Sequence, residues 1–280
     1  MCEMLGISVE NKLPLCSFAF VDDFRKRGVI GDTRRFSSLD NPRSCDGWGI
    51  AFYLGKRATM IKEPLMASES ALFRSLTDSG NGFPSITKSR IFILHLRQTI
   101  STSAPVSYEN THPFTHNLFG REYAFAHNGS IKSFAKGNGA FGSGIGRYQP
   151  VGATDSEYAM CYLLNRIRKR GIMDWDANGF IWLGEQLREI GEYGTFNCLF
   201  SEGDLLFAYR GKTEERTLYV SRLKHAPGYA VTRFDFIDRK YASRAEPLEK
   251  DTLMVLNKGR IVCKHTKRPT RQKMAMRQTI

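Results

Sequence analysis

Residues 1–8 of the chain read MCEMLGIS, and the whole interpretation of the sequence turns on this stretch. Residues 4–8 are a short apolar run, typical of a strand that begins almost at the terminus. Cys2 follows the initiator Met directly, and Met1 is removed when the second residue is as small as cysteine. The new terminus would then carry a thiol beside a free α-amine.

Such a terminus has a chemical use. An α-amine has a pKa of about 7.7–8.0, so it accepts a proton near neutral pH. It can therefore activate its own side chain for nucleophilic attack, as N-terminal threonine enzymes do. The alternative is that Cys2 only fills space where a strand enters the core. Position alone favours that alternative, so the decision rests on the rest of the chain.

Charge is unevenly distributed. The formal net charge is +13, from 41 basic and 28 acidic residues. Residues 264–280 contribute six of the basic residues and no acid, and they have no apolar periodicity, so we expect a disordered tail. A solvated tail is favoured over one that binds nucleic acid, although a basic tail can do so non-specifically. We expect residues 1–263, with a charge of +7, to form one domain.

Several functional classes lack support. The first 30 residues hold no secretory signal, and no stretch approaches the ~18 apolar residues of a membrane span, so we expect a cytoplasmic protein. The six cysteines are irregularly spaced without a CxxC pair, which argues against a disulfide scaffold and structural zinc. Neither GxGxxG after a strand nor GxxxxGK[ST] occurs. No metal or cofactor is expected.

The order of predicted elements indicates the α+β class. Strands cluster toward both ends of the chain and are joined by hairpin-type turns, with no alternating βαβ pattern. Thr154 is predicted to cap the clearest helix, with Glu157 completing a capping box. A glycine-rich loop at 135–152 is a candidate lid over a site. The helices are predicted at residues 15–28, 68–80, 154–171 and 180–194.

Four further stretches stand in order behind the leading Met-Cys: DGWGIAFY at 46–53, HLR at 95–97, ENTHPF at 109–114 with AHNG at 126–129, and TDSE at 154–157. Together they resemble the class II glutamine amidotransferases of the N-terminal-nucleophile hydrolase superfamily, in their compact, stand-alone bacterial type. EPL at 246–248 is similar to that group's late strand motif. Each motif alone is weak, but the ordered set is specific. The resemblance implies a four-layer αββα sandwich.

The resemblance also implies a reaction. Cys2 would attack the γ-amide of glutamine, release ammonia and form a thioester that water hydrolyses. Asn128 and Gly129 would form the oxyanion hole, which needs donors aimed in advance. The alternative for Asn-Gly is an ordinary hairpin turn. Arg97 would bind the substrate α-carboxylate and Asp155 its α-ammonium; otherwise Arg97 is a strand-end charge and Asp155 a first-turn acid.

Other residues of the motifs are expected to support the site. His112 and His127 are interpreted as hydrogen-bonding residues, because a terminal amine makes a catalytic histidine unnecessary. Trp48 and Gly49 resemble the segment that packs beside the nucleophile in the family. One departure from the family pattern follows Arg97, where related sequences usually carry a small polar residue and then a glycine. Here residues 98–102 read QTIST, and the side chain of Ile100 cannot form a hydrogen bond. This departure affects the choice between free glutamine and another γ-glutamyl compound.

Two roles follow from these observations. The preferred one is an enzyme, a glutamine amidotransferase or γ-glutamyl amidohydrolase, whose ammonia passes to a separate synthase subunit or is simply released. The other is an inactive scaffold of the same fold, which binds an acidic partner or nucleic acid through its basic tail. The set Cys2, Arg97, Asn128, Gly129 and Asp155 favours the enzyme, because a scaffold would lose some of these residues by drift.

Overall fold

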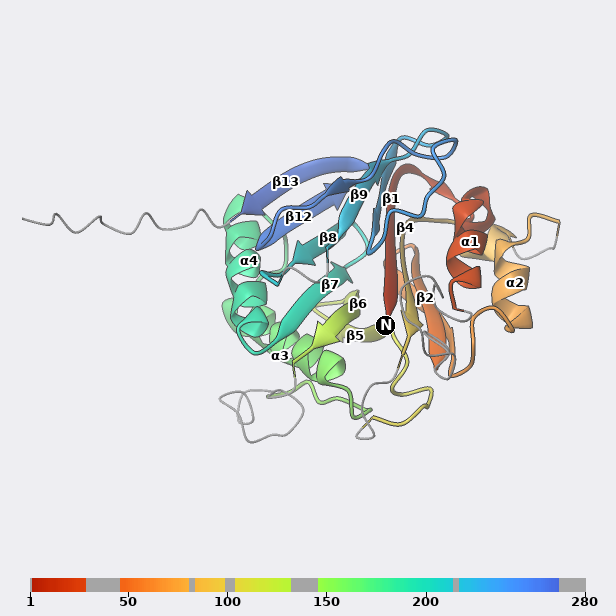
Figure 1. The fold of residues 1–280 in the computed structure, drawn as a ribbon. Helices are drawn as coiled ribbons and strands as arrows, with labels where there is room; N and C mark the ends of the chain where they lie inside the picture. Colours follow the sequence, from red (N-terminus) through yellow and green to blue (C-terminus); the bar gives the residue numbers. More distant parts are fainter. Residues whose placement is uncertain are drawn as a thin grey trace, which may run out of the picture.

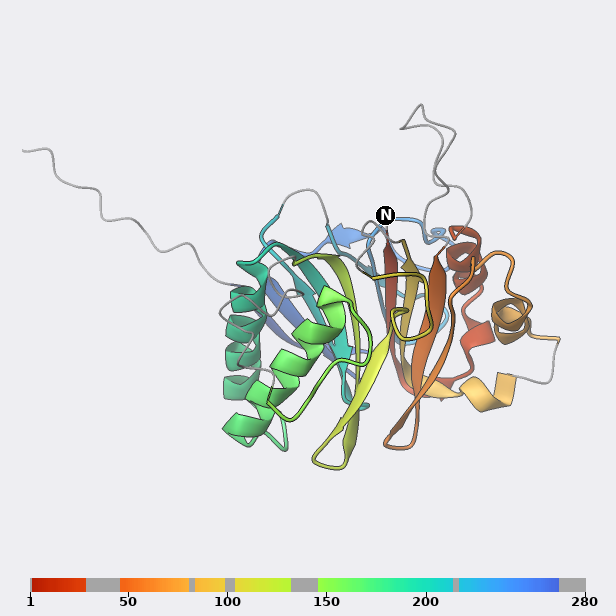
Figure 2. The same ribbon diagram turned by 90° about the horizontal axis from the view of Figure 1, so that it is seen from below.

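Two antiparallel β-sheets lie face to face in the computed structural model of the chain, and helices cover the outer side of each sheet (Figure 1). Seen from below, the molecule is four layers deep, in the order helices, sheet, sheet, helices (Figure 2). The four-layer αββα sandwich expected from the sequence is therefore confirmed. The structure describes residues 2–28, 46–80, 84–98, 104–131, 146–213 and 217–266.

The first sheet, here called sheet A, has seven strands in the order β11-β9-β10-β1-β4-β2-β3. β1 lies between β4 and β10, so the chain begins inside this sheet. The strands of sheet A are β1 (Glu3–Leu13), β2 (Gly47–Leu54), β3 (Arg57–Glu63), β4 (Ser89–Arg97), β9 (Tyr219–Arg222), β10 (Gly228–Thr232) and β11 (Glu246–Pro247).

The second sheet, sheet B, has six strands in the order β13-β12-β8-β7-β6-β5. Its hairpins turn where the sequence places Gly-Asp and Asn-Lys-Gly, with Gly203, Lys258 and Gly259 at positive φ. The strands of sheet B are β5 (Phe114–Leu118), β6 (Arg121–Ser130), β7 (Thr195–Ser201), β8 (Leu205–Arg210), β12 (Thr252–Asn257) and β13 (Arg260–Thr266).

Helices α1 (Phe20–Lys26) and α2 (Ala71–Thr77) cover sheet A, whereas α3 (Asp155–Arg170) and α4 (Ala177–Gly191) cover sheet B. Short 3-10 helices, η1 (Leu15–Ser17) and η2 (Pro84–Thr87), complete the set. The single helix predicted at 15–28 is wrong, because it is divided into η1 and α1. Phe18 leaves the helical region at φ −107° and ψ 84°, and the Leu15 N–H bonds to the Thr87 hydroxyl at 3.1 Å.

Strand alternation sorts the apolar residues into three layers. Odd residues of β1 pack with α1 and α2, while Met4 of the same strand lies in the small core between the sheets. Alanines of β2, β6 and β8 share that middle core, which lets the two sheets approach closely. Within the described residues, no helix is long and apolar enough to cross a membrane.

Two predicted boundaries can be compared with the strands. β13 runs to Thr266, past the domain boundary expected at residue 263, and the tail beyond 266 lies outside the described residues. The predicted glycine-rich loop at 135–152 is described only from residue 146 onward. Asn128 and Gly129 lie inside β6 and not at a turn, because β6 pairs with β7 as far as Ser130.

Candidate active site

Cys2 lies directly before β1, at the end of sheet A where β4 finishes. The Gln98 backbone N–H donates to Cys2 Sγ at 3.2 Å, and the thiol lies 3.4 Å from the Gln98 carbonyl oxygen. Because Cys2 has the same parity as Met4, its side chain belongs to the face of sheet A that looks toward sheet B. The half-buried thiol is thus fixed at one end of the space between the sheets.

Asn128 comes to the same place from sheet B. Its side chain is fully buried, and Asn128 Nδ2 donates to the carbonyl oxygen of Cys2 at 2.8 Å. The next residue, Gly129, has no room for a side chain, since a Cβ atom there would lie 1.8 Å from the Thr195 carbonyl oxygen. The amide donor, the glycine backbone and the thiol therefore meet across the two sheets.

Arg97 is the last residue of β4 and is buried beside Cys2. Its Nη2 donates to the Ala104 carbonyl at 2.7 Å, while buried Nη1 has no hydrogen-bond partner within the described residues. Burial lowers the pKa of Arg97, and the nearby Cys2 and Asp46 side chains oppose this shift. The guanidinium therefore stands next to the thiol with a donor available for a ligand.

Asp155 begins α3, directly after the capping residue Thr154. Its Oδ2 accepts the backbone N–H of Ile131 at 2.7 Å, and its Oδ1 accepts the Ser156 hydroxyl at 3.3 Å. Because Ile131 follows Gly129 by two positions, this carboxylate lies at the end of β6 that carries Asn128. The half-buried side chain places a negative charge on the sheet B side of the site.

The two predicted supporting histidines point in different directions, His127 toward α3 and His112 toward sheet A. His127 is directed toward α3, with its Nδ1 2.8 Å from the Ser156 hydroxyl and its Nε2 3.2 Å from the Thr195 carbonyl oxygen. His112 instead stacks on His95, with ring centroids 4.2 Å apart. Burial holds the pKa of His112 well below its usual range, so this ring is neutral. Neither ring nitrogen of His112 has a hydrogen-bond partner in the part of the chain that the structure describes.

Trp48 and Gly49 occupy opposite faces of β2. Trp48 packs under α2, stacked on Phe73 at 4.4 Å, and its Nε1–H donates to Glu63 at 3.1 Å. Gly49 faces sheet B, where a Cβ atom would lie 2.2 Å from the His112 carbonyl oxygen. Gly49 therefore supports the site through a close backbone approach, whereas Trp48 contacts the helix side of the sheet.

Two buried basic residues near the site were not singled out from the sequence. His95 is completely buried, and its Nε2 lies 3.2 Å from the carbonyl oxygen of His127 in the other sheet. Lys62 of β3 donates to the Thr111 carbonyl at 2.9 Å and lies over the Tyr108 ring. Burial lowers the pKa of Lys62 to about 8, against the opposing effect of Glu157. The sequence gives no sign of this, because a lysine in an edge strand usually faces water.

The described residues bring together a thiol, a buried amide donor, a guanidinium and a carboxylate at one end of the sandwich. This set can attack, polarise and orient a small amide that carries its own charges. No group of three or more histidine, cysteine or acidic side chains able to hold a metal ion occurs among these residues. Five cysteines are free thiols, and Cys45 lies outside the description.

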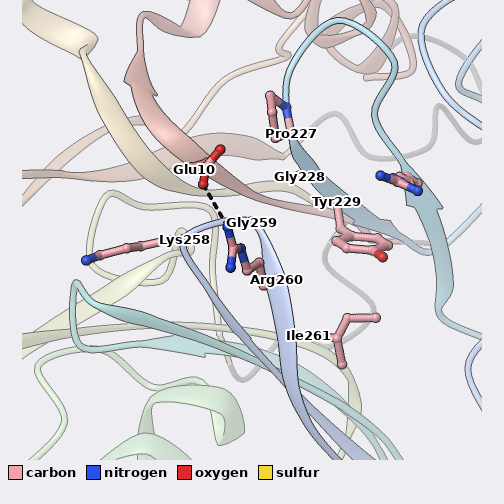
Figure 3. Close-up of a pocket in the computed structure, with 9 residues that line it drawn as sticks. Glu10, Pro227, Gly228, Tyr229, Lys258, Gly259, Arg260 and Ile261 are labelled. Carbon is pink, nitrogen blue, oxygen red and sulfur yellow. Dashed lines mark hydrogen bonds and ion pairs between the residues drawn. The ribbon is translucent and has the colours of Figure 1, made fainter.

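Figure 3 shows a cavity of about 410 Å³, which lies away from Cys2 along β1. Tyr229 and Ile261 line it, and the Arg260 guanidinium forms an ion pair with Glu10 at 3.1 Å. Gly228, also in the lining, pairs with Val9 of β1. At about 3.3 Å per residue, this position is about 23 Å along the strand from Cys2. The cavity is therefore separate from the candidate site.

Comparison with known proteins points to one family. The sequence profile of the family described as "Glutamine amidotransferases class-II" matches residues 1–244. The chain is 34% identical over 217 residues to "Putative glutamine amidotransferase YafJ" of Escherichia coli, covering 75% of this chain and 72% of that protein. It is 38% identical over 235 residues to "Uncharacterized protein MJ1515" of Methanocaldococcus jannaschii, covering 84% of this chain but only 57% of that protein.

Solved structures agree in fold. A "predicted glutamine amidotransferase" from Pseudomonas aeruginosa aligns with a TM-score of 0.61 and 26% identity, over 94% of this chain and all of that chain. The glutamine phosphoribosylpyrophosphate amidotransferase of B. subtilis aligns with a TM-score of 0.64 and 16% identity, over 95% of this chain and 49% of that chain. The second likeness concerns the fold alone.

Proposed function

The chain belongs to the class II glutamine amidotransferases, and we propose that it hydrolyses the side-chain amide of glutamine or of another γ-glutamyl compound through Cys2. The observation that carries the proposal is the bond from Asn128 Nδ2 to the Cys2 carbonyl oxygen, 2.8 Å long and formed across the two sheets. It brings an oxyanion-type donor to the residue that carries the thiol.

In the proposed mechanism Met1 is removed and the Cys2 α-amine acts as the base. It takes the thiol proton as Sγ attacks the γ-carbonyl carbon, and the C=O electrons move onto oxygen. One N–H of Asn128 and the backbone N–H of Gly129 bind this oxyanion. As the tetrahedral intermediate collapses, the C–N bond breaks and the ammonium group of Cys2 returns the proton, so ammonia leaves glutamine, or an amine leaves another γ-glutamyl compound, and a thioester remains. Water, activated by the same amine, then releases glutamate.

Substrate recognition follows from the charges around the thiol. We propose that Arg97 binds the α-carboxylate, through the Nη1 donor that has no partner in the described residues. Asp155, on the sheet B side, takes the α-ammonium group. Ile100 lies in residues 99–103, outside the description, so the choice among γ-glutamyl compounds stays a matter for a substrate panel.

Two fates for the ammonia remain within the proposal. A separate synthase subunit accepts it, or the protein is a free-standing amidohydrolase. A panel of glutamine, γ-glutamyl peptides and γ-glutamyl thiols, assayed without any partner, bears on this choice. Preference for a peptide favours the free-standing enzyme, because its hydrolysis releases an amine and no ammonia, whereas preference for free glutamine fits both fates. The inactive-scaffold alternative rests on the basic tail, which lies largely outside the described residues.

The decisive test is Cys2→Ala, with Cys16→Ala as the matched control. Cys16 is also a half-buried free thiol, but it lies on η1. We expect Cys2→Ala to abolish glutamate release because it removes the nucleophile, and Cys16→Ala to retain it. Intact mass of the wild-type sample should show that Met1 is gone. Undiminished release in Cys2→Ala, or an active protein that keeps Met1, contradicts the mechanism.

A further inference from the structure

His95 joins the two sheets directly below the nucleophile. It belongs to β4 and pairs in register with Met4 of β1 and Gly49 of β2. His95 is two residues before Arg97 in the strand, so both side chains point to the same face of sheet A. Its side chain is completely buried. His95 Nε2 lies 3.2 Å from the carbonyl oxygen of His127, in sheet B. The histidine therefore reaches across the sandwich to the residue that precedes Asn128.

On one side of β6 the strand ladder stops short of Asn128. The ladder between β5 and β6 ends with the pair of Phe114 and Phe125, whereas β6 continues to Ser130. Among the described strands, β6 beyond Phe125 therefore pairs only with β7. His112, which precedes β5, turns toward sheet A, where its carbonyl comes close to Gly49. The segment of β6 that carries Asn128 is thus supported by a strand on one side and by His95 on the other.

The protonation state of His95 is fixed by its surroundings. Burial lowers its pKa to about 3; the nearby His127 and Arg97 side chains act in the same direction, and the hydrogen bond to the His127 backbone opposes them. The ring is therefore neutral at physiological pH. A carbonyl oxygen only accepts hydrogen bonds, so the single ring proton must be on Nε2. Nδ1 has no hydrogen-bond partner within the described residues, and the neutral His112 ring stacks on this side chain.

Two hydrogen bonds thus cross between the sheets at consecutive residues of β6, in opposite directions. His95 of sheet A donates to the carbonyl of His127, and Asn128 of sheet B donates to the carbonyl of Cys2. We propose that His95 is a positioning residue, whose neutral Nε2–H fixes the β6 backbone and thereby sets Asn128 against Cys2. This inference rests on the proposed function, because it gives Asn128 the oxyanion role.

If His95 were only structural, losing its bond would affect the protein as the loss of any other buried inter-sheet bond does. Tyr53 offers a matched control for this alternative. The Tyr53 hydroxyl donates to the Ser201 carbonyl at 2.9 Å, also from sheet A to sheet B and also buried. Tyr53 lies near the other end of β2, six residues from Gly47 beside the site. Tyr53→Phe removes an inter-sheet bond of the same kind away from Asn128, because the part of β6 beside its hydroxyl is Ala124, four residues earlier.

The experiment compares His95→Leu, His95→Gln and Tyr53→Phe with the wild type. We expect His95→Leu to lower kcat roughly 10- to 100-fold with little change in KM, since a misplaced catalytic group costs rate more than binding. His95→Gln keeps an N–H donor near the Nε2 position and should recover most of the loss. Tyr53→Phe should lower the melting temperature but leave kcat unchanged. Alkylation of Cys2 by iodoacetamide, which needs no Asn128 donor, should be unchanged in every variant.

The outcomes separate the two proposals. A wild-type protein without amide hydrolysis overturns the proposed function, whatever the variants do. An active wild type with an equally active, folded His95→Leu variant overturns the positioning role alone. So does an equal loss of kcat in His95→Leu and Tyr53→Phe at matched stability, or a loss of Cys2 alkylation in step with hydrolysis. If His95→Leu does not fold, failure of a folded His95→Gln variant to retain kcat contradicts the proposal.

Discussion

Cys2 is held from two directions. The Gln98 N–H fixes the sulfur within sheet A, and the Asn128 amide fixes the Cys2 carbonyl from sheet B. Neither contact uses the α-amine. The residue is therefore anchored through its side chain and its carbonyl, and in the proposed mechanism its α-amine acts as the base.

The oxyanion role of Asn128 can be tested at the same scale. Asn128→Asp keeps the size of the side chain but replaces two N–H donors by acceptors when ionised. We expect kcat to fall roughly 100- to 1000-fold, the usual cost of one lost oxyanion donor. Steady-state glutamate release measures this directly.

Asn165→Asp is the control for that prediction. Asn165 is equally buried, and its amide donates to the Cys161 carbonyl at 2.9 Å within α3. Both substitutions should lower stability, but only Asn128→Asp should lower kcat. Equal rates in Asn128→Asp and the wild type would remove Asn128 from the mechanism.

The sequence predicts which residue types gather at the site better than it predicts their orientation. The motifs of Cys2, Arg97 and Asn128 stand far apart in the chain, and the structure brings all three to one end of the sandwich. Alternation in a strand implies that Trp48 and Gly49 face opposite sides, but only the register with β4 shows which one faces sheet B. The contact of His95 cannot be predicted from the sequence for a related reason, because its partner, the His127 carbonyl, belongs to the other sheet.

At the scale of elements, α3 begins as its sequence predicts but not with a full capping box. Thr154 accepts the Glu157 N–H at 3.2 Å, as expected. The Glu157 carboxylate does not return to the Thr154 N–H, and accepts the N–H groups of Val151 and Gly152 instead. These two hydrogen bonds fix the turn at residues 151–152 to α3, and this turn leads into Asp155.

This arrangement predicts different effects for two caps. Thr154→Ala and Asp176→Ala each remove one N-cap bond, at α3 and α4 respectively, and each should lower the free energy of unfolding by about 1 kcal/mol. Only Thr154→Ala should also raise KM, since Asp155 follows it directly. Urea denaturation and steady-state kinetics measure the two effects. Equal KM values in both variants would mean that the Thr154 cap does not contribute to substrate binding.

Other elements show where sequence patterns stop being informative. Asn-Gly is typical of a turn, yet residues 128–129 continue β6 because β7 pairs with them. β5 was not predicted, since its five residues, FTHNL, carry too little alternation to mark a strand. It exists because the hairpin with β6 ends in a turn with Phe119 and Gly120 at positive φ. In both cases pairing with a neighbouring strand overrides the local signal.

On the scale of the whole molecule, the space between the sheets is apolar in the middle and basic at the end near Cys2. His95 and His112 are buried there as neutral rings, because burial lowers both pKa values. An unfolded histidine has a pKa of about 6.5 and binds a proton below it, while these folded rings do not. Acid must therefore favour the unfolded state.

We expect the free energy of unfolding to fall as the pH is lowered from about 6.5 toward 5. Each fully neutral buried histidine contributes up to about 1.4 kcal/mol per pH unit in this range. Above pH 6.5 both states are neutral at these positions, so the contribution to the slope disappears. Urea denaturation at a series of pH values measures it.

His95→Gln provides the internal comparison, because it removes one titrating ring and keeps a donor. Its free energy of unfolding should depend less steeply on pH than that of the wild type between pH 6.5 and 5. An unchanged slope would mean that His95 is protonated in the folded protein. Asp22, whose pKa is lowered, acts at lower pH, and buried Glu202, whose pKa is raised, is present in both proteins, so neither changes the difference between the two slopes.

The position of Cys2 directly before β1 has a practical consequence for anyone producing the protein. Under the proposed mechanism, a purification tag fused ahead of Cys2 acylates the amine that must act as base. Cleavage that leaves even one extra residue has the same effect. A recombinant sample should therefore carry its tag elsewhere, or be released by a protease that cuts immediately before the cysteine. An inactive tagged preparation would otherwise be mistaken for an inactive protein.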